Sequence, residues 1–147
     1  MPAAALMYLT PLAAIAVIDV RTLRAPNRYV YPLIALGVVL SLTIYRAHAV
    51  EALLGGVFAF VVLLVVALFG RGQMGLGDVK YGVVCGIAVG VHGALPMLAF
   101  AFLAGAAVAV VVLGLGLRRR EDVVAFTPFL FVGVLLALVY PGSYLVA

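Results

Sequence analysis

The chain has 147 residues, of which 68% are hydrophobic and 10% are charged, with a formal net charge of +4 and a mean hydropathy of +1.36. Soluble domains carry roughly a quarter charged residues, so this composition excludes a small soluble protein and predicts an integral membrane protein. No stretch is left for a separate soluble domain, and we expect residues 1–147 to form a single membrane domain. The one cysteine, Cys85, excludes an internal disulfide and any zinc or redox site built on paired cysteines.

Uncharged stretches predict the membrane crossings, because a spanning helix needs about 20 apolar residues. Four stretches are long enough for one crossing each: 1–18, 29–45, 52–70 and 123–147. A fifth, 81–117, is long enough for two, and its sequence His-Gly-Ala-Leu-Pro at 92–96 suggests the break. The sequence therefore predicts an all-α bundle of six membrane helices.

The basic residues orient this bundle. Of the nine lysines and arginines, all but Arg46 lie in the first, third and fifth predicted loops: Arg21, Arg24, Arg28, Arg71, Lys80, Arg118, Arg119 and Arg120. The positive-inside rule places these three loops in the cytoplasm, which puts the N- and C-termini outside it. Because the positive charge lies beside membrane spans, we expect membrane lipid and not nucleic acid as the surrounding partner.

Asp19 ends the first predicted span, and a carboxylate at membrane depth is a functional hypothesis by default because it is costly there. Pro26 and Asn27 follow as a turn, since the residue before a proline is pushed away from helical geometry. The alternative is an ordinary helix-end carboxylate that reaches water beside Arg21 or Arg24.

Asp78 lies in the second polar motif, Gly75-Leu76-Gly77-Asp78-Val79-Lys80. A fourth helix that began after Lys80 would extend only about 16 Å to residue 91, so we expect it to begin near Gly77 or Asp78. Gly75 and Gly77 allow a substrate backbone to approach closely. The alternative is a flexible loop in which Asp78 caps the helix.

Small residues continue from Asp78 at intervals of four, at Gly82, Gly86 and Gly90. Such spacing lets membrane helices approach closely and keeps these positions on one face. We therefore expect Asp78 to point into the bundle.

Two carboxyl groups held close together tend to share one proton. The ionised member can act as a general base on water, and the protonated member can polarise a peptide carbonyl. The helix start at Asp78 gives a slight reason to name it the base, because the helix dipole favours its charged form. The sequence leaves the assignment of the two roles open.

Together the motifs resemble the type IV prepilin peptidases, the bacterial branch of the Gly-x-Gly-Asp intramembrane aspartyl proteases. Asp19 is followed at the family's spacing by Pro26 and Asn27, although Ala25 replaces the usual isoleucine. The second motif matches at Gly75, Gly77, Asp78 and Lys80, and a third element matches at Pro128-Phe129-Leu130.

The resemblance implies a peptidase of the bacterial inner membrane that removes the short basic leader of a prepilin or pseudopilin. It implies Asp19 and Asp78 as catalytic residues without a cofactor, and Gly75, Gly77, Lys80, Pro26 and Asn27 as substrate-binding or site-shaping residues. Lys80 is equally well explained as a topology anchor. The chain lacks the paired-cysteine domain that the family associates with pilin methylation, so we expect the short, peptidase-only form.

Two alternatives remain. A presenilin-like or signal-peptide-peptidase-like protease shares Gly-x-Gly-Asp, but Ile18 stands where those families usually have tyrosine before the first aspartate. A small proton-coupled transporter is the other, although its carboxylates usually lie near the bilayer midplane. His48 and His92 fall in separate outer loops, so we expect no metal site. The sequence does not indicate an oligomeric state.

Overall fold

The computed structural model describes residues 2–22, 27–44, 46–70, 74–116 and 125–139, with the backbone alone at 2–7, 22 and 27. Its α-helices are α1 (Pro2–Thr22), α2 (Asn27–Thr43), α3 (Ala49–Phe69), α4 (Leu76–Gly114) and α5 (Thr127–Val139). A short 3-10 turn, η1 (Arg46–His48), precedes α3. These described segments contain no strand, so the predicted all-α class is confirmed.

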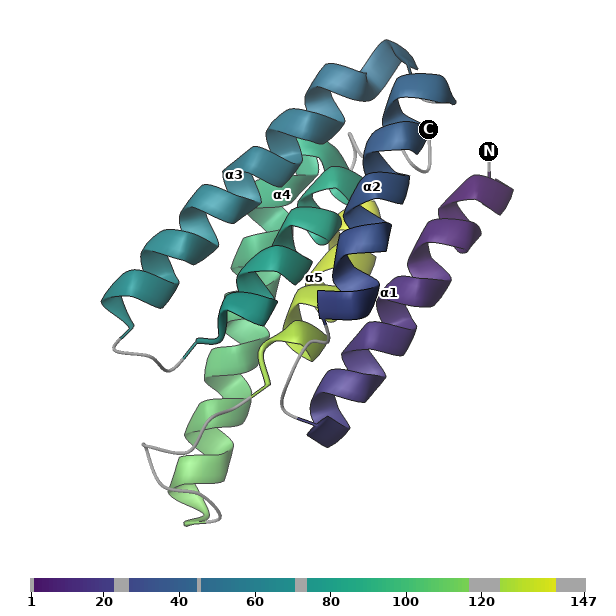
Figure 1. The fold of residues 1–147 in the computed structure, drawn as a ribbon. Coiled ribbons are helices and arrows are strands. Elements are labelled where there is room, and N and C mark those ends of the chain that lie inside the picture. Colours follow the sequence, from purple (N-terminus) through teal and green to yellow (C-terminus); the bar gives the residue numbers. More distant parts are fainter. Residues whose placement is uncertain (1, 23–26, 45, 71–73, 117–124, 140–147) are drawn as a thin grey trace.

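The long helix α4 is two helices joined at Gly90, whose backbone angles are φ 73° and ψ 176°. This region of backbone space is open essentially only to glycine. Before Gly90 the helix runs in the same direction as α5, and after Gly90 it runs in the opposite direction, as Figure 1 shows. Asp78 and Gly82 lie near Thr127 and Leu130, whereas Gly133 lies near Met97 and Gly105 near Phe126.

The break therefore falls at Gly90 and not at residues 92–96, where the sequence suggested it. Pro96 lies inside the helix that follows the break. The reversal depends on a positive φ at one residue, and a glycine provides this more readily than the ring of a proline, which fixes φ near −65°.

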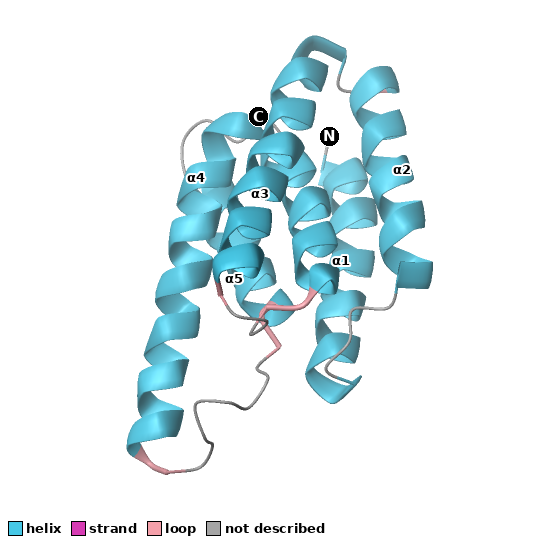
Figure 2. Cartoon of the chain, turned by 60° about the vertical axis from the view of Figure 1, so that its left-hand side comes forward, coloured by secondary structure: helices cyan, strands magenta, loops and turns pink. Residues whose placement is uncertain are grey.

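Successive helices of this bundle alternate in direction (Figure 1). The end of α1, the start of α4 and the start of α5 lie at one end of the bundle, and the start of α1 and the end of α5 lie toward the other. Figure 2 shows that the second half of α4 extends past the other helices at the first of these ends. The side of the membrane on which each end lies stays a prediction.

Two helical stretches are long and apolar enough to cross a membrane by length and composition, Arg46–Phe69 and Leu76–Gly114. Shorter apolar helices occupy Arg28–Thr43 and Thr127–Val139. Large apolar side chains such as Leu68 and Val110 point outward from this bundle. An apolar outer surface of this kind suits a lipid environment.

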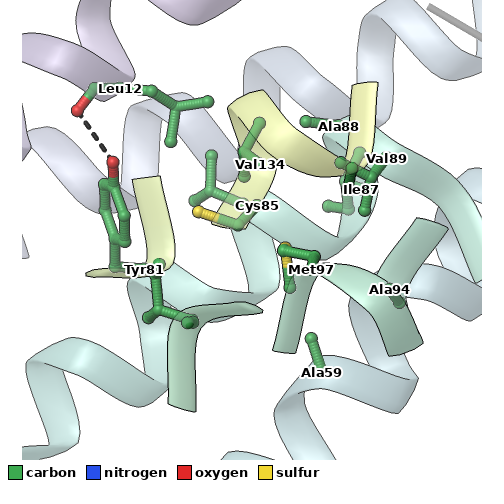
Figure 3. Close-up of a cluster of buried hydrophobic side chains, with 14 of the residues drawn as sticks. Leu12, Ala59, Tyr81, Cys85, Ile87, Ala88, Val89, Ala94, Met97 and Val134 are labelled. Atoms are coloured by element: carbon green, nitrogen blue, oxygen red, sulfur yellow. Dashed lines mark hydrogen bonds between the residues drawn. The ribbon is translucent and has the colours of Figure 1, made fainter. Parts of the chain in front are cut away.

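The first half of α4 lies at the centre of the bundle, with Tyr81, Val84, Cys85 and Val89 fully buried. Figure 3 shows part of this core, in which Leu12 of α1 and Val134 of α5 also take part. The small residues expected to face a neighbour do so, since Gly82, Gly86 and Gly90 lie against Leu63, Ala59 and Gly55 of α3.

Candidate active site

Asp78 is the third residue of α4, which begins at Leu76 with Gly75 as its N-cap. The Asp78 N–H donates to the Gly75 carbonyl at 3.1 Å, and the Gly75 backbone hydrogen bonds the Asp78 carboxyl group in return. Gly75 has no side chain, so only one half of a capping box forms here, the bond from the third helical residue back to the N-cap backbone. Asp78 is thus held inside the helix start, one turn deeper than the N-cap position of the alternative prediction, and is 8% exposed.

Thr127, the first residue of α5, supplies two further donors to Asp78. Its backbone N–H donates to Asp78 Oδ1 at 3.1 Å, and its hydroxyl donates to the same oxygen at 2.6 Å. The N–H groups at a helix start have no partner within the helix, so a carboxylate placed there is favourable. Thr127 is fully buried, which shields both hydrogen bonds from water.

Asp19, near the end of α1, reaches the same place. Its carboxyl group interacts with the side chain and the backbone of Thr127, and it is close enough to Asp78 for the two carboxyl groups to interact electrostatically. Asp19 is 2% exposed although Arg21, two residues later, is exposed. The alternative in which Asp19 reaches water is therefore wrong.

One oxygen at this meeting point is unsatisfied. Oδ2 of Asp19 is buried and has no hydrogen-bond partner among the described residues. Buried polar atoms are almost always paired, and exceptions often mark a catalytic role. Among the described side chains, no group of three or more His, Cys, Asp or Glu is arranged to hold a metal ion.

Two tyrosines join α1 to α4 by hydrogen bonds, farther from this end of the bundle than the aspartates. The Tyr81 hydroxyl donates to the Leu12 carbonyl at 2.8 Å, the contact drawn in Figure 3. The Tyr8 hydroxyl donates to the Val84 carbonyl at 3.2 Å. Both bonds are buried and join residues far apart in sequence, so they fix how far Asp19 stands from Asp78 along the two helices.

The remaining residues of the two motifs have different surroundings. The Lys80 ammonium lies over the ring of Tyr31 in α2, 4.8 Å from its centre. Gly77 is half-buried and Gly75 is exposed beside the Asp78 carboxyl group. Pro26 lies outside the described residues, and Asn27 begins α2 but its side chain also lies outside them.

Thr127 is not among the site residues that the sequence predicts, although it directly precedes the matched element Pro128-Phe129-Leu130. A threonine just before a proline and an apolar run is typical of a helix start, and this was the available signal. The structure gives it a second role, because its donors point away from its own helix and into the Asp78 carboxyl group.

Comparison of the sequence with known protein families gives a match. The model of the type IV leader peptidase family matches residues 6–110, a range that includes Asp19, Asp78 and both of their motifs. No curated protein and no solved structure matches the chain significantly. Since the family match covers most of the sequence, the chain belongs to the type IV leader peptidase family, whose members are membrane peptidases.

Proposed function

We propose that the chain is an intramembrane aspartyl endopeptidase in which Asp19 and Asp78 form the catalytic pair. The observation that carries this is the meeting of two buried carboxyl groups, from α1 and α4, at Thr127. Both acids lie in the part of the chain that matches the leader peptidase family. A pair of carboxyl groups that shares one proton contains the base and the acid that peptide hydrolysis needs.

In the proposed reaction the ionised carboxylate takes a proton from a water molecule, whose oxygen bonds to the peptide carbon. The protonated carboxyl group gives its proton to the carbonyl oxygen, and a tetrahedral intermediate forms. The carboxyl group that took the proton then passes it to the leaving nitrogen as the C–N bond breaks. The substrate carbon re-forms a C=O bond as one of its two hydroxyl groups returns a proton to the other aspartate carboxylate. The catalytic pair therefore ends in the protonation state in which it began.

The proposed substrate is a prepilin or pseudopilin, cut behind its short basic leader. We place the enzyme in the bacterial inner membrane as one domain of six crossings, with both termini outside the cytoplasm. Support comes from the basic loops: Arg21, Arg28 and Lys80 lie on the elements that meet at the same end of the bundle as the aspartates. A cytoplasmic leader would reach the pair from that end.

Gly75, Gly77, Lys80, Pro26 and Asn27 are the proposed substrate-binding or site-shaping residues. The exposed backbone of Gly75 lies beside Asp78, where a Cβ atom would stand 3.7 Å from Oδ2 of the aspartate. The absence of a side chain there leaves the approach to the carboxyl group open. Family membership does not favour the transporter alternative, and we do not propose it.

Co-expression with a candidate prepilin from the same genome tests the proposal, with leader removal followed by gel shift. We expect cleavage by the parent and none by Asp19→Asn or Asp78→Asn. Glu51→Gln is the matched control, because Glu51 lies in α3, paired with His48 at 3.3 Å and away from both aspartates. Cleavage that survives both aspartate changes would exclude the pair from the mechanism.

A further inference from the structure

The two aspartates share Thr127 unequally. Oδ1 of Asp78 accepts from both the N–H and the hydroxyl of Thr127, and the Gly75 backbone also bonds this carboxyl group. Asp19 interacts with the same threonine but keeps a buried oxygen, Oδ2, without a described partner. The family match ends at residue 110, so it assigns nothing to Thr127.

We propose that Thr127 is a positioning residue that holds Asp78 as the hydrogen-bond acceptor of the pair and so leaves the shared proton to Asp19. The proposal rests on the proposed function, since it assigns the two roles of the same catalytic pair. It makes Asp78 the base, and it makes Asp19 the acid that faces the substrate carbonyl.

The two carboxyl groups differ in the hydrogen-bond donors around them. An ionised carboxylate is only an acceptor, and charge-assisted hydrogen bonds to it are the strong ones. Oδ1 of Asp78 already accepts two hydrogen bonds, from the N–H and the hydroxyl of Thr127, whereas among the described residues no donor reaches Oδ2 of Asp19. A negative charge on Asp19 would leave buried Oδ2 without a donor, whereas a proton on that oxygen supplies a donor for a bound carbonyl.

The geometry of α5 makes the arrangement rigid. The N–H of Thr127 is one of the free N–H groups at the start of the helix, so one of its two donors is fixed by the backbone. The rest of α5 is anchored against α4 by buried Leu130 and Val134. Thr127 therefore acts on the pair from a third helix, independent of the two helices that carry the aspartates.

Substitution tests the hydroxyl. Thr127→Val keeps the shape and the N–H donor but removes the hydroxyl, and we expect kcat to fall about tenfold to one-hundredfold with little change in KM. Thr127→Ser restores the donor and should recover most of the activity. Thr43→Val is the matched control, because the Thr43 hydroxyl donates within α2, to the Val39 carbonyl at 2.7 Å. Parental activity in Thr127→Val, or no recovery in Thr127→Ser, would overturn the proposal.

Infrared spectroscopy tests the proton without a substrate, so it decides the inference even if no prepilin is cleaved. At neutral pH we expect the parent to show the carbonyl band of a protonated carboxylic acid. Asp19→Asn should lose this band and Asp78→Asn should keep it. The reverse pattern, or the same result in both variants, would contradict the assignment. If Thr127→Val fails to fold, this comparison still stands, because it uses only the parent threonine.

Discussion

Gly86 of α4 and Gly55 of α3 touch through their backbones. A Cβ atom on Gly86 would meet the Gly55 carbonyl oxygen, and one on Gly55 would meet the Gly86 carbonyl oxygen. The contact continues to both sides, with Ala59 beside Gly86 and Gly90 beside Gly55. The helix that carries Asp78 is thus seated against α3 along a face that has no room for larger side chains.

Gly86→Ala should lower the free energy of unfolding by about 1–3 kcal/mol, because the added methyl group forces the two backbones apart. The new Cβ atom would also stand 2.9 Å from the Ala59 Cβ atom. Unfolding can be followed by maleimide labelling of Cys85, the one cysteine, which is fully buried in the core.

Gly114→Ala is the control for this change, since a Cβ atom there would have no neighbour within 4 Å. Its free energy of unfolding should stay within about 0.5 kcal/mol of the parent. Equal labelling rates for the two variants would show that the Gly55–Gly86 contact does not limit stability.

Gly90→Ala should destabilise the reversal of α4 by about 1–3 kcal/mol, because an L side chain is strained at φ 73° and ψ 176°. The second half of α4 would then lose its fixed direction against α5. Heat unfolding in detergent measures the loss, with Gly114→Ala again as the control. A Gly90→Ala variant as stable as the parent would mean that the chain turns elsewhere.

How much of this arrangement the sequence predicts depends on the kind of signal. The all-helical class follows from long apolar stretches, and burial of Asp78 follows from the glycine series, because both patterns repeat along the chain. The position of the break cannot be predicted in this way. Gly82, Gly86, Gly90 and Gly93 look alike in sequence, and packing decides that Gly90 is the one of these four with positive φ.

The candidate site could likewise be predicted only in part from the sequence. Motif spacing singled out Asp19 and Asp78, which the structure brings together, and their catalytic role stays a prediction. Thr127 could not be found from spacing, because its part depends on how the start of α5 packs against the start of α4. Contacts between helices distant in sequence leave little trace in a single chain.

The contact between Lys80 and Tyr31 ties α4 to the start of α2, and it should be measurable as a coupling. Lys80→Met and Tyr31→Leu should each destabilise the protein, and the double variant should show a coupling of about 0.5–1 kcal/mol, the range for a cation over an exposed ring. Tyr31→Phe keeps the ring and should keep the coupling. Strictly additive single changes would instead assign Lys80 to topology or to substrate binding.

The Tyr81 hydroxyl should matter for both stability and catalysis, because it bonds α1 at Leu12 while Tyr81 itself lies one turn after Asp78. Tyr81→Phe should lower the free energy of unfolding by about 0.5–1.5 kcal/mol, the usual value for one hydrogen bond. It should also lower kcat, because α1 then holds Asp19 less firmly against Asp78. Tyr29→Phe is the control, since the ring of Tyr29 lies exposed at the surface. If Tyr81→Phe lost stability but cleaved a prepilin at the parental rate, this bond would support the fold without setting the spacing of the aspartates.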